Sequence, residues 1–95
     1  EIFSLCKENG WNAVLVTPPY PAVYTECFPS EMMDRFDAIV EALSEESNVP
    51  WLNYAQDCEF TENFAYFKNI DHLNLAGAHA FASKLQPRLT ELGLW

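Results

Sequence analysis

A histidine with amide and carboxylate neighbours stands out among the residues able to do chemistry. Asn69, Asp71 and His72 lie within four consecutive positions, directly before a segment with helical spacing that starts at Asn74. A histidine outside the carboxyl ends of parallel strands can act as a general base when an amide or carboxylate orients its ring. A histidine at such a junction is more often a plain hydrogen-bonding residue, so the residue types alone leave both interpretations open.

Other candidate ligands give weaker patterns. Asp71, His72 and His79 have the residue types of a metal site but lack the ligand spacing of known sites, so we expect neither a metal nor a cofactor and interpret His79 as a surface residue. The three cysteines have no CxxC spacing. This favours reduced, partly buried thiols over a disulfide framework or a zinc site.

The N-terminal half must position these residues through a helix, a strand, a helix and a second strand. The first helix stops at Asn9 and Gly10, and residues 13–17 form an apolar run typical of a parallel strand covered on both faces. Prolines at positions 18, 19 and 21 end that strand. Ser30 is a good N-cap for an amphipathic helix that ends near Asn48, and residues 49–54 follow as a short strand.

The C-terminal half predicts one further helix. Residues 55–70 hold aromatic side chains without a regular period, so we predict an aromatic-pinned loop there. From the N-cap Asn74, apolar residues at positions 78, 81, 82, 85, 89 and 92 form the stripe of a helix that ends at Gly93. Gly77 is expected to permit close packing of this helix against the sheet, and Pro87 to kink or restart it.

The order of these elements predicts an α/β fold with a short parallel sheet flanked by helices. A strand, helix, strand connection favours parallel strands with a right-handed crossover. Two strands alone make a marginal sheet with open edges. We therefore expect a missing N-terminal part of the same domain, or a homodimer, to complete it.

The segment FKNIDHLNLAGAHAF resembles the last conserved block of the SGNH/GDSL hydrolases, in the variant written DxDHLNxxGAxxF. The strand that ends in TPPY also resembles the strand and proline loop that precede this block. Residues 1–95 as a whole resemble the C-terminal part of a larger SGNH-like domain. The resemblance implies a three-layer α/β/α, flavodoxin-like fold that hydrolyses or transfers acyl esters, such as carbohydrate O-acetyl groups, through a Ser-His-Asp triad.

The resemblance assigns roles to three residues of this sequence. His72 matches the catalytic histidine, Asn69 stands where the family usually has its carboxylate, and Asp71 matches the additional acid of the DHLN variant. An asparagine can hold a histidine tautomer but cannot stabilise imidazolium by charge. The sequence leaves open whether Asn69 or Asp71 orients His72.

The nucleophilic serine of the family, with its Gly-Asp-Ser context, has no counterpart among these residues. The resemblance therefore implies a fragment that is inactive unless an upstream serine completes it. The alternative is a degenerate, non-catalytic hydrolase fold that serves as a binding or assembly module.

Composition narrows the possible partners. With 49% apolar and 15% aromatic residues the chain is expected to fold around one core. A net charge of −9 repels phosphate backbones and anionic lipid headgroups, so nucleic acid and membrane surfaces are unfavourable partners. No apolar run reaches the roughly 20 residues that a membrane helix needs.

Overall fold

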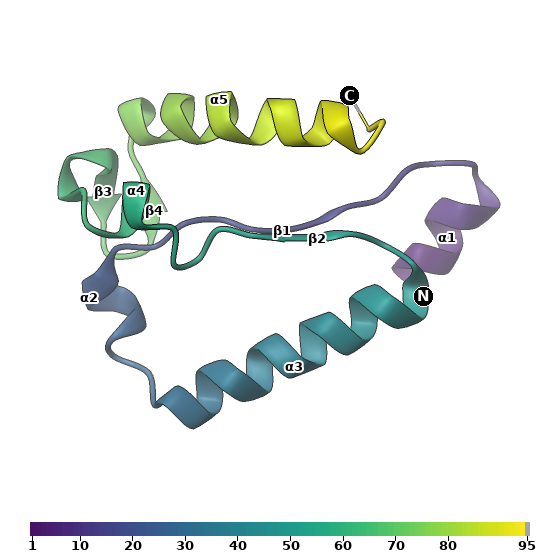
Figure 1. Ribbon diagram of the computed structural model, residues 1–95, viewed down its shortest axis with the longest axis horizontal. Helices are drawn as coiled ribbons and strands as arrows, with labels where there is room; N and C mark the ends of the chain where they lie inside the picture. Colours follow the sequence, from purple (N-terminus) through teal and green to yellow (C-terminus); the bar gives the residue numbers. More distant parts are fainter. Residues whose placement is uncertain (95) are drawn as a thin grey trace.

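The computed structural model describes residues 1–94, which form a mixed α/β domain (Figure 1). The elements of the N-terminal half are α1 (Ile2–Glu8), β1 (Leu15–Thr17), α2 (Ala22–Thr25), α3 (Ser30–Ser47) and β2 (Trp51–Asn53). Those of the C-terminal half are α4 (Cys58–Thr61), the 3-10 helix η1 (Phe64–Tyr66), β3 (Phe67–Asn69), β4 (His72–Leu73) and α5 (Leu75–Glu91). The predicted α/β class is confirmed.

β1 and β2 lie far apart in the sequence and pair in parallel, as predicted. Leu15 pairs with Trp51 and Thr17 with Asn53, and α3 makes the crossover between the strands. Each strand is shorter than predicted because Pro18 and Pro50 bound the paired segments and have no N–H to donate. α3 and α5 lie on opposite sides of the two strands (Figure 1).

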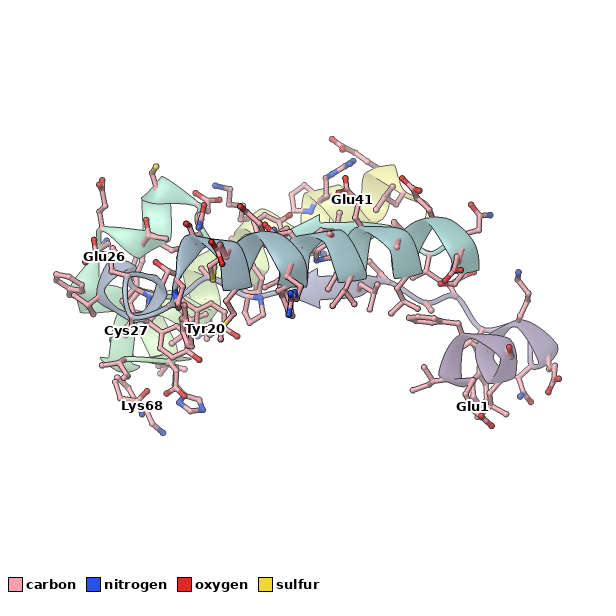
Figure 2. The ribbon with its side chains drawn as sticks, turned by 90° about the horizontal axis from the view of Figure 1, so that it is seen from below. Glu1, Tyr20, Glu26, Cys27, Glu41 and Lys68 are labelled. Carbon is pink, nitrogen blue, oxygen red and sulfur yellow. The ribbon has the colours of Figure 1, made fainter. Side chains whose placement is uncertain are left out.

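Different elements lie at the two ends of the molecule. Both parallel strands run toward the end where α2, α4, β3 and β4 gather, so their carboxyl ends meet there (Figure 1). Figure 2 shows Tyr20, Cys27 and Lys68 at this end, whereas Glu1 and α1 lie at the opposite end. The carboxyl ends of parallel strands are where α/β folds place their ligand sites.

The N-terminal end of α3 differs from the prediction, and the C-terminal end agrees with it. The helix begins at Ser30 itself, and Pro29 occupies the N-cap position without a side-chain cap, so the prediction that Ser30 caps the helix is wrong. Pro29 has the extended backbone of an N-cap, and its missing N–H costs nothing there. At the other end Asn48 adopts a left-handed conformation with φ of 54°, which ends the helix where the sequence predicted.

Residues 55–70 are not the predicted loop, because they contain α4, η1 and β3. Each of these elements has only three or four residues, too few to show a period in the sequence. The predicted aromatic pinning is nevertheless present. Phe60 is 0% exposed and lies 5.5 Å from Tyr66 and 6.0 Å from Phe81, measured between ring centroids, so it joins this segment to α5.

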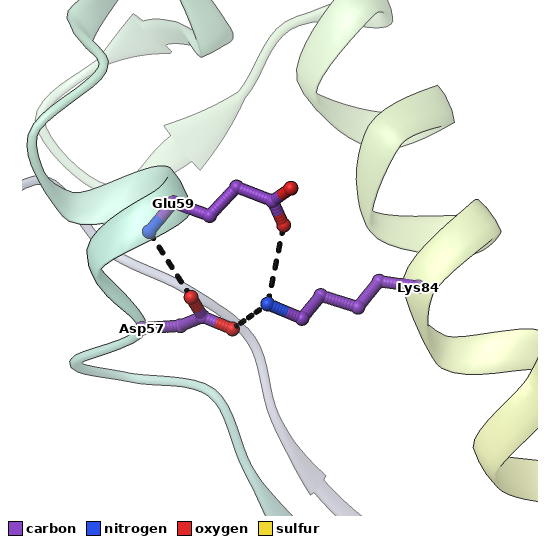
Figure 3. Close-up of polar contacts among 3 residues, drawn as sticks. All are labelled: Asp57, Glu59 and Lys84. Atoms are coloured by element: carbon purple, nitrogen blue, oxygen red, sulfur yellow. Dashed lines mark hydrogen bonds and ion pairs between the residues drawn. The ribbon is translucent and has the colours of Figure 1, made fainter.

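A lysine of α5 adds a polar connection to the same segment (Figure 3). Lys84 Nζ lies 2.5 Å from Asp57 Oδ2 and 3.1 Å from Glu59 Oε2, and 5.7 Å from the centroid of the Phe60 ring. The hydrogen bond to Asp57 raises the pKa of Lys84, and Glu59 adds to that effect. α5 also continues through Pro87 instead of restarting, and Ala78 and Ala82 face solvent rather than the core.

Candidate functional site

The candidate site lies on a tight antiparallel hairpin. Asn69, at the end of β3, pairs with His72, at the start of β4, and Ile70 and Asp71 form the two-residue turn between them. His72 was expected on a loop that leads into a helix. It lies instead on a two-residue strand, separated from α5 only by Asn74.

This hairpin brings the three predicted site residues into contact. His72 Nδ1 lies 3.0 Å from Asn69 Oδ1 and 2.7 Å from Asp71 Oδ1. Asn69 Oδ1 also accepts the backbone N–H of Asp71 at 3.1 Å, which holds the turn in place. Both candidate orienters therefore reach the same ring nitrogen, because the turn folds Asp71 back onto its neighbour.

The contacts define what the imidazole can do. Both partners are oxygen acceptors, so Nδ1 carries the proton and donates it to them, and the lone pair lies on Nε2. Within residues 1–94, Nε2 has no hydrogen-bond partner, and the His72 side chain is 64% exposed. A ring held in this way can accept a proton from a hydroxyl that approaches Nε2, which is the role of histidine in a catalytic triad.

Asn74 and Gly77 fix the position of the hairpin against the rest of the domain. Asn74 Oδ1 caps α5 by accepting the Gly77 N–H at 2.9 Å, and its Nδ2 donates to the Ala65 carbonyl at 2.6 Å. A Cβ on Gly77 would lie 2.1 Å from the Tyr66 carbonyl oxygen. Gly77 thus permits the expected close packing, but against η1 and β4 rather than the sheet.

Tyr20 belongs to the same region although it lies 51 positions before Asp71 in the sequence. Burial raises the pKa of Tyr20, and the neighbouring Tyr24 and the Asp71 carboxylate raise it further. The phenol is therefore close enough to the hairpin to feel the Asp71 charge. The sequence left open whether Tyr20 and Tyr24 line a crevice or cover the core. The available signal was their position within and just beyond the proline segment that ends β1.

The serines of the chain lie elsewhere. Ser4 is in α1, Ser83 is in α5, and the other three are in α3, where Ser44 donates to the Val49 carbonyl and Ser47 to that of Leu43. In residues 1–94 no serine hydroxyl contacts His72.

Neither a metal site within residues 1–94 nor a known relative assigns a function to this chain. Among the described residues there is no group of three or more histidine, cysteine, aspartate or glutamate side chains arranged to hold a metal ion. The three cysteines are free thiols, and no helix in the described part of the chain is long and apolar enough to span a bilayer. Comparison with protein-family models, curated proteins and solved structures finds no match for this chain.

Proposed function

We propose that this chain is the C-terminal part of an SGNH-like ester hydrolase or acyltransferase in which His72 is the general base. The observation that carries the proposal is the ring geometry. Asn69 and Asp71 hold Nδ1, while Nε2 has no hydrogen-bond partner within residues 1–94, at the end of the molecule where the parallel strands finish. The location of α3 and α5 on opposite sides of the strands also agrees with a partial three-layer α/β/α fold of the flavodoxin-like type.

The reaction needs a hydroxyl nucleophile from residues outside this chain. That hydroxyl would add to the ester carbonyl while Nε2 of His72 takes its proton, and Asp71 would stabilise the resulting imidazolium. The imidazolium would then give the proton to the leaving alcohol oxygen as the ester C–O bond breaks, and water or an acceptor alcohol would release the acyl group from the serine by the same steps. Asn69 would keep the Nδ1 tautomer fixed. Supply of the serine by an N-terminal part of the same domain would also cover the open edge of β1.

The proposal is tested by kinetics on the longest protein that contains this chain, with an aryl acetate as substrate. We expect His72→Ala to lower kcat/KM by about a thousandfold or more, since general-base catalysis and positioning of the nucleophile are lost together. His79→Ala is the matched control, because His79 is an exposed histidine of α5. The kcat/KM of this variant should equal that of the parent protein. Equal rates for His72→Ala and the parent protein would overturn the catalytic role.

The two orienters can be separated in the same assay. We expect Asp71→Asn to lower the rate more than Asn69→Ala, by about tenfold or more, because only Asp71 supplies negative charge to the imidazolium. A larger loss for Asn69→Ala would mean that the turn, rather than the charge, sets the rate.

A second candidate function is a non-catalytic assembly module. Apolar side chains on the outer face of α3 favour it, with Ile39 61% exposed and Leu43 also exposed, as do the free edges of the two-stranded sheet. Self-association into a homodimer would cover these surfaces, and light scattering at micromolar concentration measures it. Labelling of the full protein by a fluorophosphonate probe would reject the non-catalytic alternative, since only an activated serine reacts.

A further inference from the structure

A pocket of about 230 Å³ opens at the carboxyl ends of the two parallel strands, at the same end of the molecule as the candidate site. Thr17, the last residue of β1, and Ala55, just after β2, form part of its lining. Most of the remaining wall comes from α2 with its flanking residues and from the first half of α3. This is the place where α/β folds bind their ligands.

One wall of the pocket is a ladder of aromatic rings. Tyr20 and Tyr24 are stacked with their ring centroids 4.9 Å apart, and Phe28 meets Tyr24 edge to face at 5.1 Å. Such contacts hold each ring in a defined orientation. The wall is therefore preformed, which lowers the cost of ordering it around a ligand.

The facing wall is apolar and adaptable. Met32, Met33 and Phe36 line it from α3, and Phe36 is 49% exposed. Methionine side chains adjust to ligands of different shape. The two threonine hydroxyls of the lining already have partners, since Thr17 Oγ1 accepts the Trp51 Nε1–H and Thr25 Oγ1 donates to a backbone carbonyl. Asp37 is the one charged residue among the described residues of the lining, and the rest of the wall offers apolar contact area rather than polar recognition.

The volume limits the size of the ligand. An apolar cavity of about 150 Å³ holds benzene, so a pocket of this size holds an apolar group of about six to nine carbon atoms. An acetyl group would leave most of it empty.

Tyr20 connects the pocket to the histidine. Its ring lines the pocket, and the Asp71 carboxylate that contacts His72 contributes to the raised pKa of its phenol, after burial and Tyr24. Figure 2 shows Tyr20 at the same end of the molecule as Lys68 of β3. The pocket and the hairpin therefore lie at the same end of the molecule.

We propose that this pocket binds an aliphatic chain of about six to nine carbon atoms carried by the ester substrate. This assignment rests on the proposed function for its link to catalysis, and it replaces short acetyl esters by longer-chain esters as the preferred class. The chain can belong to the acyl part or to the alcohol part of the ester, since both present the same chemistry to the wall.

The test uses amides that mimic the two kinds of ester and are not hydrolysed. N-ethylhexanamide carries the six-carbon chain on its acyl side, N-hexylacetamide carries it on the other side, and N-ethylacetamide has no long chain. All three are neutral, so the net charge of −9 does not repel them. Met32 and Met33 are the only methionines of the chain and both line the pocket, so their labelled methyl groups report on it by NMR.

We expect saturable shifts of both methyl signals with at least one six-carbon amide, and binding of N-ethylacetamide at least tenfold weaker. The tighter of the two long amides identifies the part of the ester that enters the pocket. Phe36→Glu should weaken binding tenfold or more, and Phe36→Ser by less, since it removes the ring without adding charge. Ile39→Glu is the matched control, because Ile39 is an exposed apolar residue of α3 outside the pocket.

Equal weakening by Phe36→Glu and Ile39→Glu, or equal affinity for the short and long amides, would overturn the assignment. So would the absence of any saturable shift. Because the amides need neither serine nor histidine chemistry, these outcomes are independent of the kinetics of His72→Ala. A failure of the pocket and a failure of the proposed catalysis are therefore distinguishable.

Discussion

Substitution of Gly77 by alanine should destabilise the domain although alanine is the better helix former. The added Cβ would lie 2.1 Å from the Tyr66 carbonyl oxygen and 2.9 Å from Leu73 Cδ2. Since a carbon and an oxygen in contact are about 3.3 Å apart, α5 and η1 would have to separate by about 1.2 Å. That movement would break the hydrogen bond from the Asn74 N–H to the Tyr66 carbonyl, which is 2.8 Å long.

Gly77→Ala changes the free energy of unfolding through three contributions, two unfavourable and one favourable. Overpacking costs about 1–3 kcal/mol and the lost hydrogen bond about 1 kcal/mol, while the higher helix propensity of alanine returns about 1 kcal/mol. The free energy of unfolding should therefore fall by about 1–3 kcal/mol. Urea denaturation followed by far-UV circular dichroism measures this change.

Ala82→Gly provides the matched control, because Ala82 is exposed on the same helix. Removing its methyl group should cost about 1 kcal/mol through helix propensity alone. Adding a methyl group at Gly77 should then cost as much as, or more than, removing one at Ala82. A Gly77→Ala variant equal to or more stable than the parent would refute the close approach of α5 to η1.

Three other substitutions test separate parts of the fold. Lys84→Met should cost about 1 kcal/mol at pH 7, because it removes the ion pairs with the two carboxylates at the start of α4. Because folding raises the pKa of Lys84, this contribution is present below the unfolded pKa and is lost as pH rises through the folded value, so parent and variant should converge in urea denaturation above about pH 10.5. Asn74→Ala should cost about 1–2 kcal/mol and speed amide hydrogen exchange of Gly77, because the cap and the bond to the Ala65 carbonyl are lost, and unchanged exchange would contradict this. Pro87→Ala should raise the melting temperature, since it restores a helical N–H inside α5, and a lower melting temperature would show that the ring of Pro87 makes packing contacts that outweigh it.

The parts of the fold that could be predicted from sequence are those whose signals are local and repeated. The apolar run at residues 13–17, which stops at Pro18, and the long apolar stripe of α3 followed by Asn48 are each visible within one stretch of sequence. The segment around Phe60 could not be predicted in the same way. Its short elements depend on contacts with α5, such as the packing of Phe60 against Phe81, which a local pattern does not contain.

In the candidate site, too, local features could be predicted from the sequence and long-range contacts could not. The residue types predicted that His72 has an orienter, but contact of both Asn69 and Asp71 with one nitrogen depends on the two-residue turn, which sequence spacing does not fix. Tyr20 lies about 50 residues from the hairpin and reaches it only because the ends of β1 and β2 meet beside β3 and β4. Long-range placement of this kind follows from the topology of the sheet.

The asparagine at position 69 fits this geometry better than a carboxylate would. An aspartate there would place two negative charges around one imidazole, and their repulsion would raise the pKa of one of them and favour its protonation. With asparagine, the amide oxygen accepts both the Asp71 N–H and the His72 Nδ1–H at no charge cost, and within residues 1–94 Asp71 is the one carboxylate that contacts the ring. In the proposed mechanism the two residues would divide the work that one carboxylate does in a conventional triad: Asn69 would fix the turn and the tautomer, and Asp71 would supply the charge that an imidazolium needs.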